Sequence, residues 1–223
     1  ITLGLGGNEY NITSTIKNTW GIYTGYIGST QENKNINIDE QGGYFGLYNN
    51  FNINKINIKT TLNTGAMDNA IKTSTDTDDF TNFWIGGAAR LSYDLKLDKT
   101  LTFTPEIFAG YTWIKSNNYT STTGESIKNT SANYFEFTPA INLIKNVGNN
   151  WFGILSVKYI IHNNSNQTTV NNIKLNNLDT GNYFEYTLTI NKQFGNLDLG
   201  INIGRHDGDR YGWLGGAKIK YLF

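Results

Sequence analysis

The feature that most constrains this chain is a two-residue alternation of apolar and polar side chains, repeated along almost the whole sequence. Residues 213–223 show it most clearly: Trp, Ala, Ile, Tyr and Phe fall at odd positions, and both lysines fall at even positions. Because successive side chains of a strand point to opposite faces of a sheet, this period predicts strands with one apolar face.

Ten further segments have the same alternation or a strand-like composition: residues 1–6, 20–28, 42–52, 56–64, 85–95, 101–113, 135–143, 151–161, 184–191 and 197–203. Most of the eleven predicted strands reach the length of about nine residues that a tilted strand needs to cross a bilayer. Strands of soluble proteins are nearer five or six residues long. The pattern therefore favours an all-β, antiparallel transmembrane β-barrel, with residues 1–223 forming a single domain.

The connections between these strands alternate between long and short. Four are long and polar, at about residues 29–41, 67–82, 115–131 and 163–181, with a shorter loop at His206–Tyr211 near the end. The turns between them are tight and rich in Asn and Gly, at about 53–54, 96–100, 145–149 and 194–196. Outer-membrane barrels sort their loops this way, with short periplasmic turns and long surface loops.

Composition removes several other classes of protein. The 18 Lys and Arg balance the 18 Asp and Glu, so the chain lacks the basic excess that binds nucleic acid. It has no cysteine for a disulfide or thiolate metal site, and its two histidines fall in different predicted loops. No run of 18 apolar residues occurs, which excludes membrane-spanning helices. We therefore expect no nucleic-acid partner, no metal and no cofactor.

On the apolar face, aromatic residues gather at both ends of the strands. Near the long loops lie Trp113, Phe135, Tyr159, Phe184 and Trp213, and near the short turns lie Tyr93, Phe103, Trp151 and Phe223. Two such groups predict aromatic belts at the two membrane interfaces.

The polar face is then the lumen of the barrel. It carries charges of both signs on successive strands: Arg90, Glu106, Glu136, Lys158, Glu185, Lys218 and Lys220. Isolated charges inside a barrel are costly unless they are paired or hydrated. We therefore expect a hydrated channel or a ladder of cross-strand ion pairs.

Strand parity predicts a longer precursor. Single-chain bacterial barrels have an even number of strands, with both ends on the periplasmic side. Eleven strands place residue 1 opposite Phe223, so we expect twelve strands with the first one upstream, although ten would also satisfy parity. A signal peptide is likewise expected upstream, so the sequence is predicted to be the C-terminal part of the precursor.

The ordered segments resemble the β-domain of classical autotransporters, the translocators of type V secretion. The resemblance extends from about residue 20 to the chain terminus and is carried by Gly43–Tyr48, Gly86–Tyr93, Leu101–Trp113 with its Pro105, and Gly215–Phe223. It implies a monomeric barrel of twelve strands in the Gram-negative outer membrane, with a helix through the pore that leads to an N-terminal passenger.

The resemblance also implies a mechanism and partners. The outer-membrane assembly machinery would recognise the terminal strand through Ile219, Tyr221 and Phe223, and the barrel would sit among lipid and lipopolysaccharide. The passenger and its linker helix would occupy the lumen during export, and passenger folding outside the cell would give the process its direction. No enzymatic activity is expected.

Three alternatives remain open at this point. A general diffusion pore would share every barrel feature and would lack the passenger. A ten-stranded, omptin-like outer-membrane protease would use His206 and Asp207 with Asp76, Asp78 and Asp79 at the rim. A barrel phospholipase would need Ser and His side by side, for which His162 and Ser165 are the only nearby pair.

Overall fold

The computed structural model is built from strands throughout. It describes residues 2–13, 15–33, 36–73, 76–129, 131–165, 168–174 and 181–221. No helix in this part of the chain is long and apolar enough to span a bilayer. The strands are β1 (Thr2–Asn11), β2 (Ile16–Asn33), β3 (Ile36–Ile53), β4 (Ile56–Lys72), β5 (Thr77–Tyr93), β6 (Leu95–Lys96), β7 (Leu101–Ser116), β8 (Tyr119–Thr120), β9 (Ser126–Asn129), β10 (Ala132–Gly148), β11 (Trp151–Ser165), β12 (Thr168–Val170), β13 (Ile173–Lys174), β14 (Tyr183–Phe194), β15 (Leu197–Gly208) and β16 (Gly212–Tyr221).

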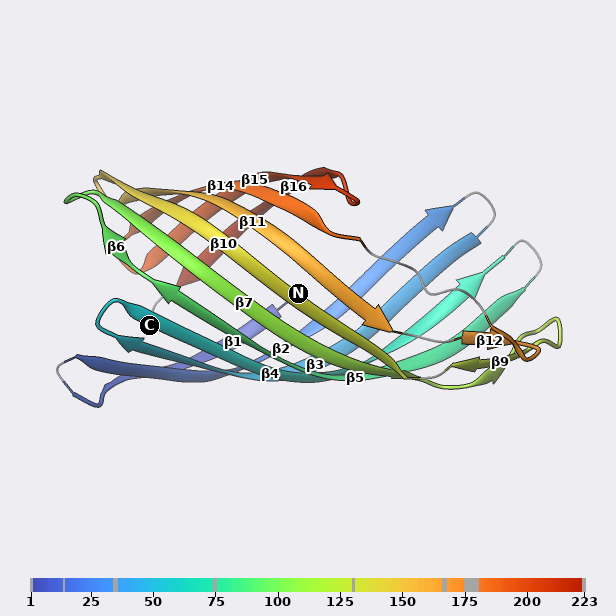
Figure 1. The fold of residues 1–223 in the computed structure, drawn as a ribbon. Helices are drawn as coiled ribbons and strands as arrows, with labels where there is room; N and C mark the ends of the chain where they lie inside the picture. Colours follow the sequence, from blue (N-terminus) through green and yellow to red (C-terminus); the bar gives the residue numbers. More distant parts are fainter. Residues whose placement is uncertain are drawn as a thin grey trace.

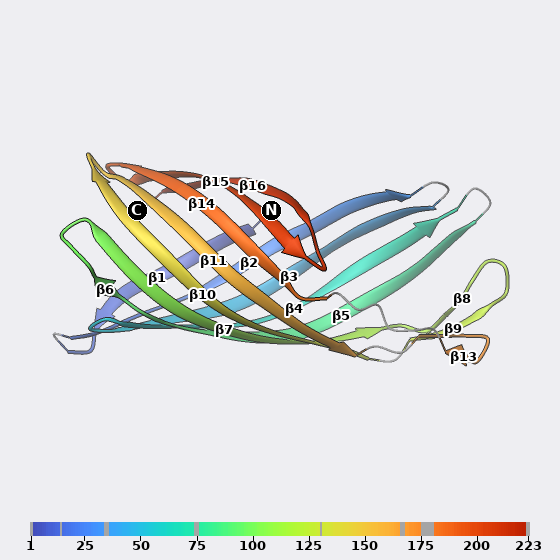
Figure 2. The same cartoon turned by 45° about the horizontal axis from the view of Figure 1, so that its top comes forward.

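One antiparallel sheet holds all eleven predicted strands in the order β1-β2-β3-β4-β5-β7-β10-β11-β14-β15-β16, with β6 added beside β7. The sheet curls around an interior, so that β14–β16 face β1–β4 across it (Figures 1 and 2). β1 and β16 are the two ends of the path, and no ladder joins them within the described residues. The all-β, antiparallel prediction is confirmed, whereas the twelfth strand and the pore helix remain predictions.

The short turns show why the sequence is rich in asparagine. Asn149 and Asn150 have φ of 49° and 62°, and they connect Gly148 to its cross-strand partner Trp151. Two residues with positive φ form the type I′ turn that matches the twist of a two-residue hairpin, and asparagine tolerates this conformation better than other side chains. Asn171 and Asn172 repeat the arrangement between β12 and β13.

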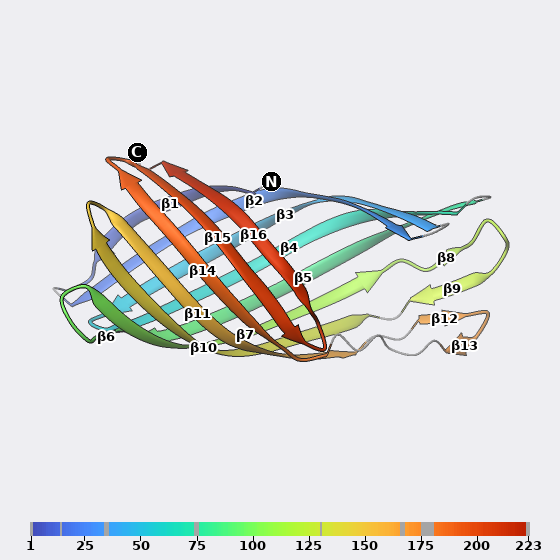
Figure 3. The same cartoon turned by 90° about the horizontal axis from the view of Figure 1, so that it is seen from above.

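Two of the four predicted long loops are mostly strand, so this part of the loop prediction was wrong. β2 pairs with β3 continuously out to Asn33 and Ile36, and β4 pairs with β5 out to Lys72 and Thr77. One face of these extensions carries the polar residues Thr30, Asp39, Asp68 and Lys72, and backbone pairing does not require apolar side chains once the strands leave the bilayer. The two hairpins project beyond the rest of the sheet (Figure 3).

The other two long connections fold into a small sheet of their own. Strands β8 and β9 from the loop after β7 join β12 and β13 from the loop after β11, in the order β13-β12-β9-β8. It lies at the same end of the molecule as the projecting hairpins (Figure 3).

Burial in the main sheet is inverted relative to a soluble protein. The most buried side chains of its strands are mainly polar or small, and include Asn69, Ser92, Thr104, Thr138, Ser156 and Asn191. The opposite face exposes large apolar residues such as Leu62 (63%), Ile201 (62%) and Ile219 (78%). A polar interior with an apolar exterior is the arrangement that a bilayer-spanning barrel requires. We call the polar side of the main sheet its inward face and the apolar side its outward face.

Candidate functional site

The predicted charged residues whose side chains the structure describes share the inward face. Three strands are linked there through the carboxylate of Glu185. Lys158 on β11 lies opposite Glu185 on β14, which lies opposite His206 on β15. Lys158 Nζ donates to Glu185 Oε1 at 2.6 Å, and His206 Nε2 lies 2.9 Å from Glu185 Oε2. Because the Glu185 side chain is only 17% exposed, its charge depends on these two partners.

A second cross-strand pair lies on the other side of β10. Arg90 Nε on β5 is 3.3 Å from Glu106 Oε1 on β7, and the Arg90 guanidinium also lies over the Phe108 ring, 5.7 Å from its centroid. Mixed charges on neighbouring strands therefore form pairs.

Both histidines of the chain belong to one row of rings on the inward face. The row runs Tyr134, His162, Tyr183 and His206, with centroid distances of 5.1, 5.5 and 4.7 Å. Glu136 approaches the row, since its Oε2 lies 3.6 Å from His162 Nε2. Sequence parity already gives His162 the inward direction, but only the register of β11, β14 and β15 brings the two histidines near one another.

The last strand carries a more exposed pair. Lys218 Nζ donates to Asp198 Oδ2 at 2.9 Å, and the Lys218 side chain is 57% exposed. Asp198 was not among the predicted charges, because the partner of Lys218 could be chosen only once the β15–β16 register was known. The backbone of Lys220 lies opposite Asp198 on the neighbouring strand.

The predicted belt aromatics that the structure describes lie on the outward face. Tyr159 contacts Phe184 across β11 and β14 with centroids 4.7 Å apart, and Trp213 is 73% exposed. At the short-turn ends, the Lys192 ammonium lies 4.6 Å from the Trp151 ring centroid. Tyr111, Tyr186 and Phe194 are further exposed aromatics that the predicted belts did not include. The remaining predicted members also have outward positions, because they alternate along their strands with inward-facing residues. They are Trp113, Phe135, Tyr93 and Phe103.

Two of the three predicted assembly-signal residues are placed by the structure. Ile219 and Tyr221 lie on the outward face of β16, 78% and 56% exposed, opposite Leu199 and Leu197. Phe223 lies outside the described residues.

The rival catalytic pairs are not assembled. His206 and Asp207 are consecutive in β15, so they point to opposite faces, and the partner of His206 is Glu185. Asp78 hydrogen-bonds to the backbone N–H of Thr122, while Asp79 has the opposite facing and Asp76 precedes β5. His162 and Ser165 likewise have opposite parity in β11, and Ser165 Oγ accepts from Asn133. Among the described residues, no group of three or more His, Asp or Glu is arranged to hold a metal.

Beyond the apolar part of the outward face, which we call the apolar band, hydrogen bonds shift the pKa values of charged side chains. Lys72 Nζ donates to Asp39 Oδ2 at 2.5 Å, which lowers the pKa of Asp39 and raises the pKa of Lys72. In the turn before β7, the pKa of Asp98 is lowered because its carboxylate accepts from the Thr100 and Leu101 N–H groups. These contacts fix the ends of strands on both sides of the band.

One family model matches almost the whole chain. The family model described as the autotransporter β-domain matches residues 3–216. No curated protein matches the sequence significantly. Among solved structures, the transport unit of the autotransporter AIDA-I from Escherichia coli is 14% identical with a TM-score of 0.85, over 100% of this chain and 81% of that one.

Two further solved structures are similar over the whole of this chain. The translocator domain of the autotransporter NalP from Neisseria meningitidis is 14% identical, with a TM-score of 0.71 and 80% of its length covered. The β domain of the Bordetella autotransporter BrkA is 15% identical, with a TM-score of 0.69 and 88% of its length covered. At these identities the likeness shows the fold.

Proposed function

The chain belongs to the autotransporter β-domain family and is an outer-membrane translocator barrel, and we propose that its inward face lines the conduit through which an N-terminal passenger reaches the cell surface. The observation that carries the proposal is the inverted burial: Asn69, Thr138 and Ser156 are each 4% exposed, while Ile141 on the opposite face is 51% exposed. A polar lining suits a polypeptide that crosses in an unfolded or helical form. It offers hydrogen bonds to the polypeptide and has no apolar surface to which exposed hydrophobic side chains would bind.

In this proposal, the inward charges form the lumen wall and their pairing keeps the wall intact. Arg90, Glu106, Glu136, Lys158, Glu185 and Lys218, together with Lys220, would face the linker helix that connects barrel and passenger. Within the described residues β1 and β16 are the two ends of the sheet, and a further strand between them would make twelve. Residues 1–223 then form one domain of a protein that works as a monomer.

The outward residues would serve membrane insertion. The aromatic groups at the two strand ends sit where aromatic belts contact the bilayer interfaces. Ile219 and Tyr221, with Phe223, would form the signal that the outer-membrane assembly machinery recognises. The barrel would contact phospholipid and lipopolysaccharide and would carry out no enzymatic reaction.

Conductance in a planar bilayer tests the proposal against a general diffusion pore. The barrel purified with its upstream linker should conduct little, because the linker occupies the lumen, and deletion of the linker should open it. A large, steady conductance with the linker present would instead support the diffusion pore. As a test of the assembly signal, deletion of Phe223 should reduce the heat-modifiable barrel in cells, with Asp209→Asn as a surface control.

A further inference from the structure

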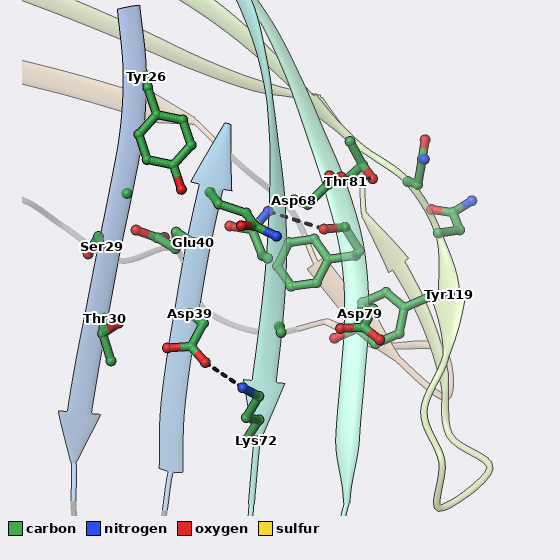
Figure 4. Close-up of a pocket in the computed structure, with 17 residues that line it drawn as sticks. Tyr26, Ser29, Thr30, Asp39, Glu40, Asp68, Lys72, Asp79, Thr81 and Tyr119 are labelled. Carbon is green, nitrogen blue, oxygen red and sulfur yellow. Dashed lines mark hydrogen bonds and ion pairs between the residues drawn. The ribbon is translucent and has the colours of Figure 1, made fainter. Parts of the chain in front are cut away.

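The charged side chains of the inward face are sorted along the axis of the barrel. Among the side chains that the structure describes, those near the long loops are acidic: Glu40, Asp78, Glu136 and Glu185. Those near the short turns are mainly basic: Lys17, Lys59, Arg90, Lys96 and Lys218, with Asp94, Glu106 and Asp198 among them. Lys158 lies between the two groups and pairs with Glu185. The projecting hairpins have the same acidic excess, since Asp39, Glu40, Asp68 and Asp79 accompany a single lysine, Lys72, in the groove that crosses them (Figure 4).

Two of the basic side chains near the short turns lie opposite one another. Lys59 on β4 and Arg90 on β5 are cross-strand partners on the inward face. Like charges in directly opposite positions destabilise a sheet. Arg90 is compensated by Glu106 at 3.3 Å, whereas the Lys59 ammonium has no hydrogen bond or ion pair among the described residues. This part of the lumen wall therefore keeps a positive charge that the described residues do not neutralise.

A cavity of about 830 Å³ lies at the same end of the barrel, beside the turn between β6 and β7. The strand residues that line it all have inward positions: Lys96, Thr102, Ile144, Asn146 and Phe152. Asp98, in the turn, is occupied by the Thr100 and Leu101 N–H groups, from which its carboxylate accepts. The ammonium groups of Lys96 and Lys99 have no hydrogen bond or ion pair within the described part of the chain. The cavity thus adds two uncompensated cations to the short-turn mouth.

The chemistry and the position of these cations identify their partner. Ammonium groups form strong, charge-assisted hydrogen bonds with carboxylates, and a cleft lined by one sign of charge concentrates ligands of the other. The inward face is separated from lipid by the sheet itself, and short turns of outer-membrane barrels face the periplasm, from which a polypeptide enters. The acidic long-loop half would repel the same ligand. We propose that the basic short-turn half of the lumen holds an acidic stretch of the exported polypeptide, an inference that rests on the proposed conduit function.

Photo-crosslinking in the full-length protein tests which segment occupies this half of the lumen. A benzophenone amino acid in place of Thr102, which lines the cavity and carries no charge, should crosslink to the chain upstream of residue 1 in cells. Mass spectrometry of the crosslinked peptide should find Asp and Glu in excess over Lys and Arg. A crosslinked segment that is neutral or basic, or export without any crosslink to the upstream chain, would overturn the inference.

Charge reversal tests the same half of the lumen through the rate of export. Per heat-modifiable barrel, Lys59→Glu with Lys96→Glu should slow the appearance of the passenger at the cell surface about tenfold in a pulse–chase with external protease. Lys59→Gln with Lys96→Gln, which only removes the charges, should slow it less.

The matched control is Lys115→Glu with Lys128→Glu, which makes the same change in charge at the long-loop end, on the outward side of β7 and in the small sheet. It should leave the rate of export unchanged. Wild-type rates in both lumen variants, or equal slowing in the control, would overturn the inference while the translocator function stands. A wild-type protein that never exposes its passenger would instead contradict the proposed function itself.

Discussion

The projecting hairpins and the last three strands are built on the same backbone ladder but carry different outward surfaces. β2 to β5 have 17 or 18 residues each, whereas β14 to β16 have 10 to 12. In β14 the outward positions Phe184, Tyr186, Leu188 and Ile190 are apolar for most of the strand. In β3 the outward positions change from Leu47 and Phe45 to Gln41 and Asp39 within one strand. The length of a strand is thus set by its backbone pairing with its neighbours. Apolar outward side chains are confined to the part of the strand that lies in the bilayer.

The largest expected effect comes from placing a charge on the apolar part of this surface. Ile141→Lys on β10 should destabilise the barrel by about 2–4 kcal/mol or block its insertion, because the ammonium would face lipid. Asp68→Lys, outward on the projecting β4, should leave insertion intact. Urea unfolding in lipid vesicles, followed by tryptophan fluorescence, measures both.

The adjacent inward position sharpens the same test. Asn142, whose side chain bonds to the Thr104 carbonyl oxygen, should accept Lys with little loss because it faces the polar interior. If Ile141→Lys and Asn142→Lys destabilise the barrel equally, the assigned facing of β10 is wrong.

The inward charge network should respond next in size. Glu185→Ala removes the shared acceptor of Lys158 and His206 and should cost about 1–3 kcal/mol, since two partly buried donors lose their partner. Lys218→Ala breaks an exposed pair on β16 and should cost less than about 1 kcal/mol. Thermal unfolding in detergent compares them, and similar losses would mean that the network adds nothing beyond a surface ion pair.

Two neighbouring glycines of β3 test how closely the projecting hairpin is packed. A Cβ at Gly42 would overlap the Ala66 carbonyl oxygen, so Gly42→Ala should destabilise by about 1–3 kcal/mol. A Cβ at Gly43 would lie 3.7 Å from the Gly25 oxygen, an ordinary contact, so Gly43→Ala should be nearly neutral. Because both substitutions add one methyl group, a nearly neutral Gly42→Ala would contradict the close approach of β3 and β4.

The smallest effect concerns pH at the tip of that hairpin. The pKa of Asp39 is lowered from 3.8. Its contribution to the stability of the hairpin is therefore present above that value and is lost as pH falls through the lower pKa of the folded state. The pKa of Lys72 is raised from 10.5. Its contribution to the stability of the hairpin is therefore present below that value and is lost as pH rises through the higher pKa of the folded state. Amide NMR shifts near Asp39 should stay constant between these limits and move outside them, and Lys72→Gln should remove the alkaline change.

The sequence was informative wherever one face is apolar and uninformative where neither is. Alternation, with strand-like composition where alternation was weak, located the eleven strands along the path of the main sheet. Alternation also gave the inward direction of Glu185 and Lys158, because a one-residue slip would turn every side chain to the other face. It ended the strands of the first two long hairpins too early, since residues such as Ser29 to Asn33 are polar on both faces. Ion-pair partners required the register, which is why Asp198 and the Glu185–His206 contact were missed.

The central claim, export of a passenger by this barrel, is tested most directly by the surface exposure of what precedes it. An epitope inserted in the precursor upstream of residue 1 should become accessible to protease added to intact cells, and Ile141→Lys should abolish that accessibility while Asn142→Lys preserves it. If the epitope stays protected in cells that contain a heat-modifiable wild-type barrel in the outer membrane, the translocator account is contradicted.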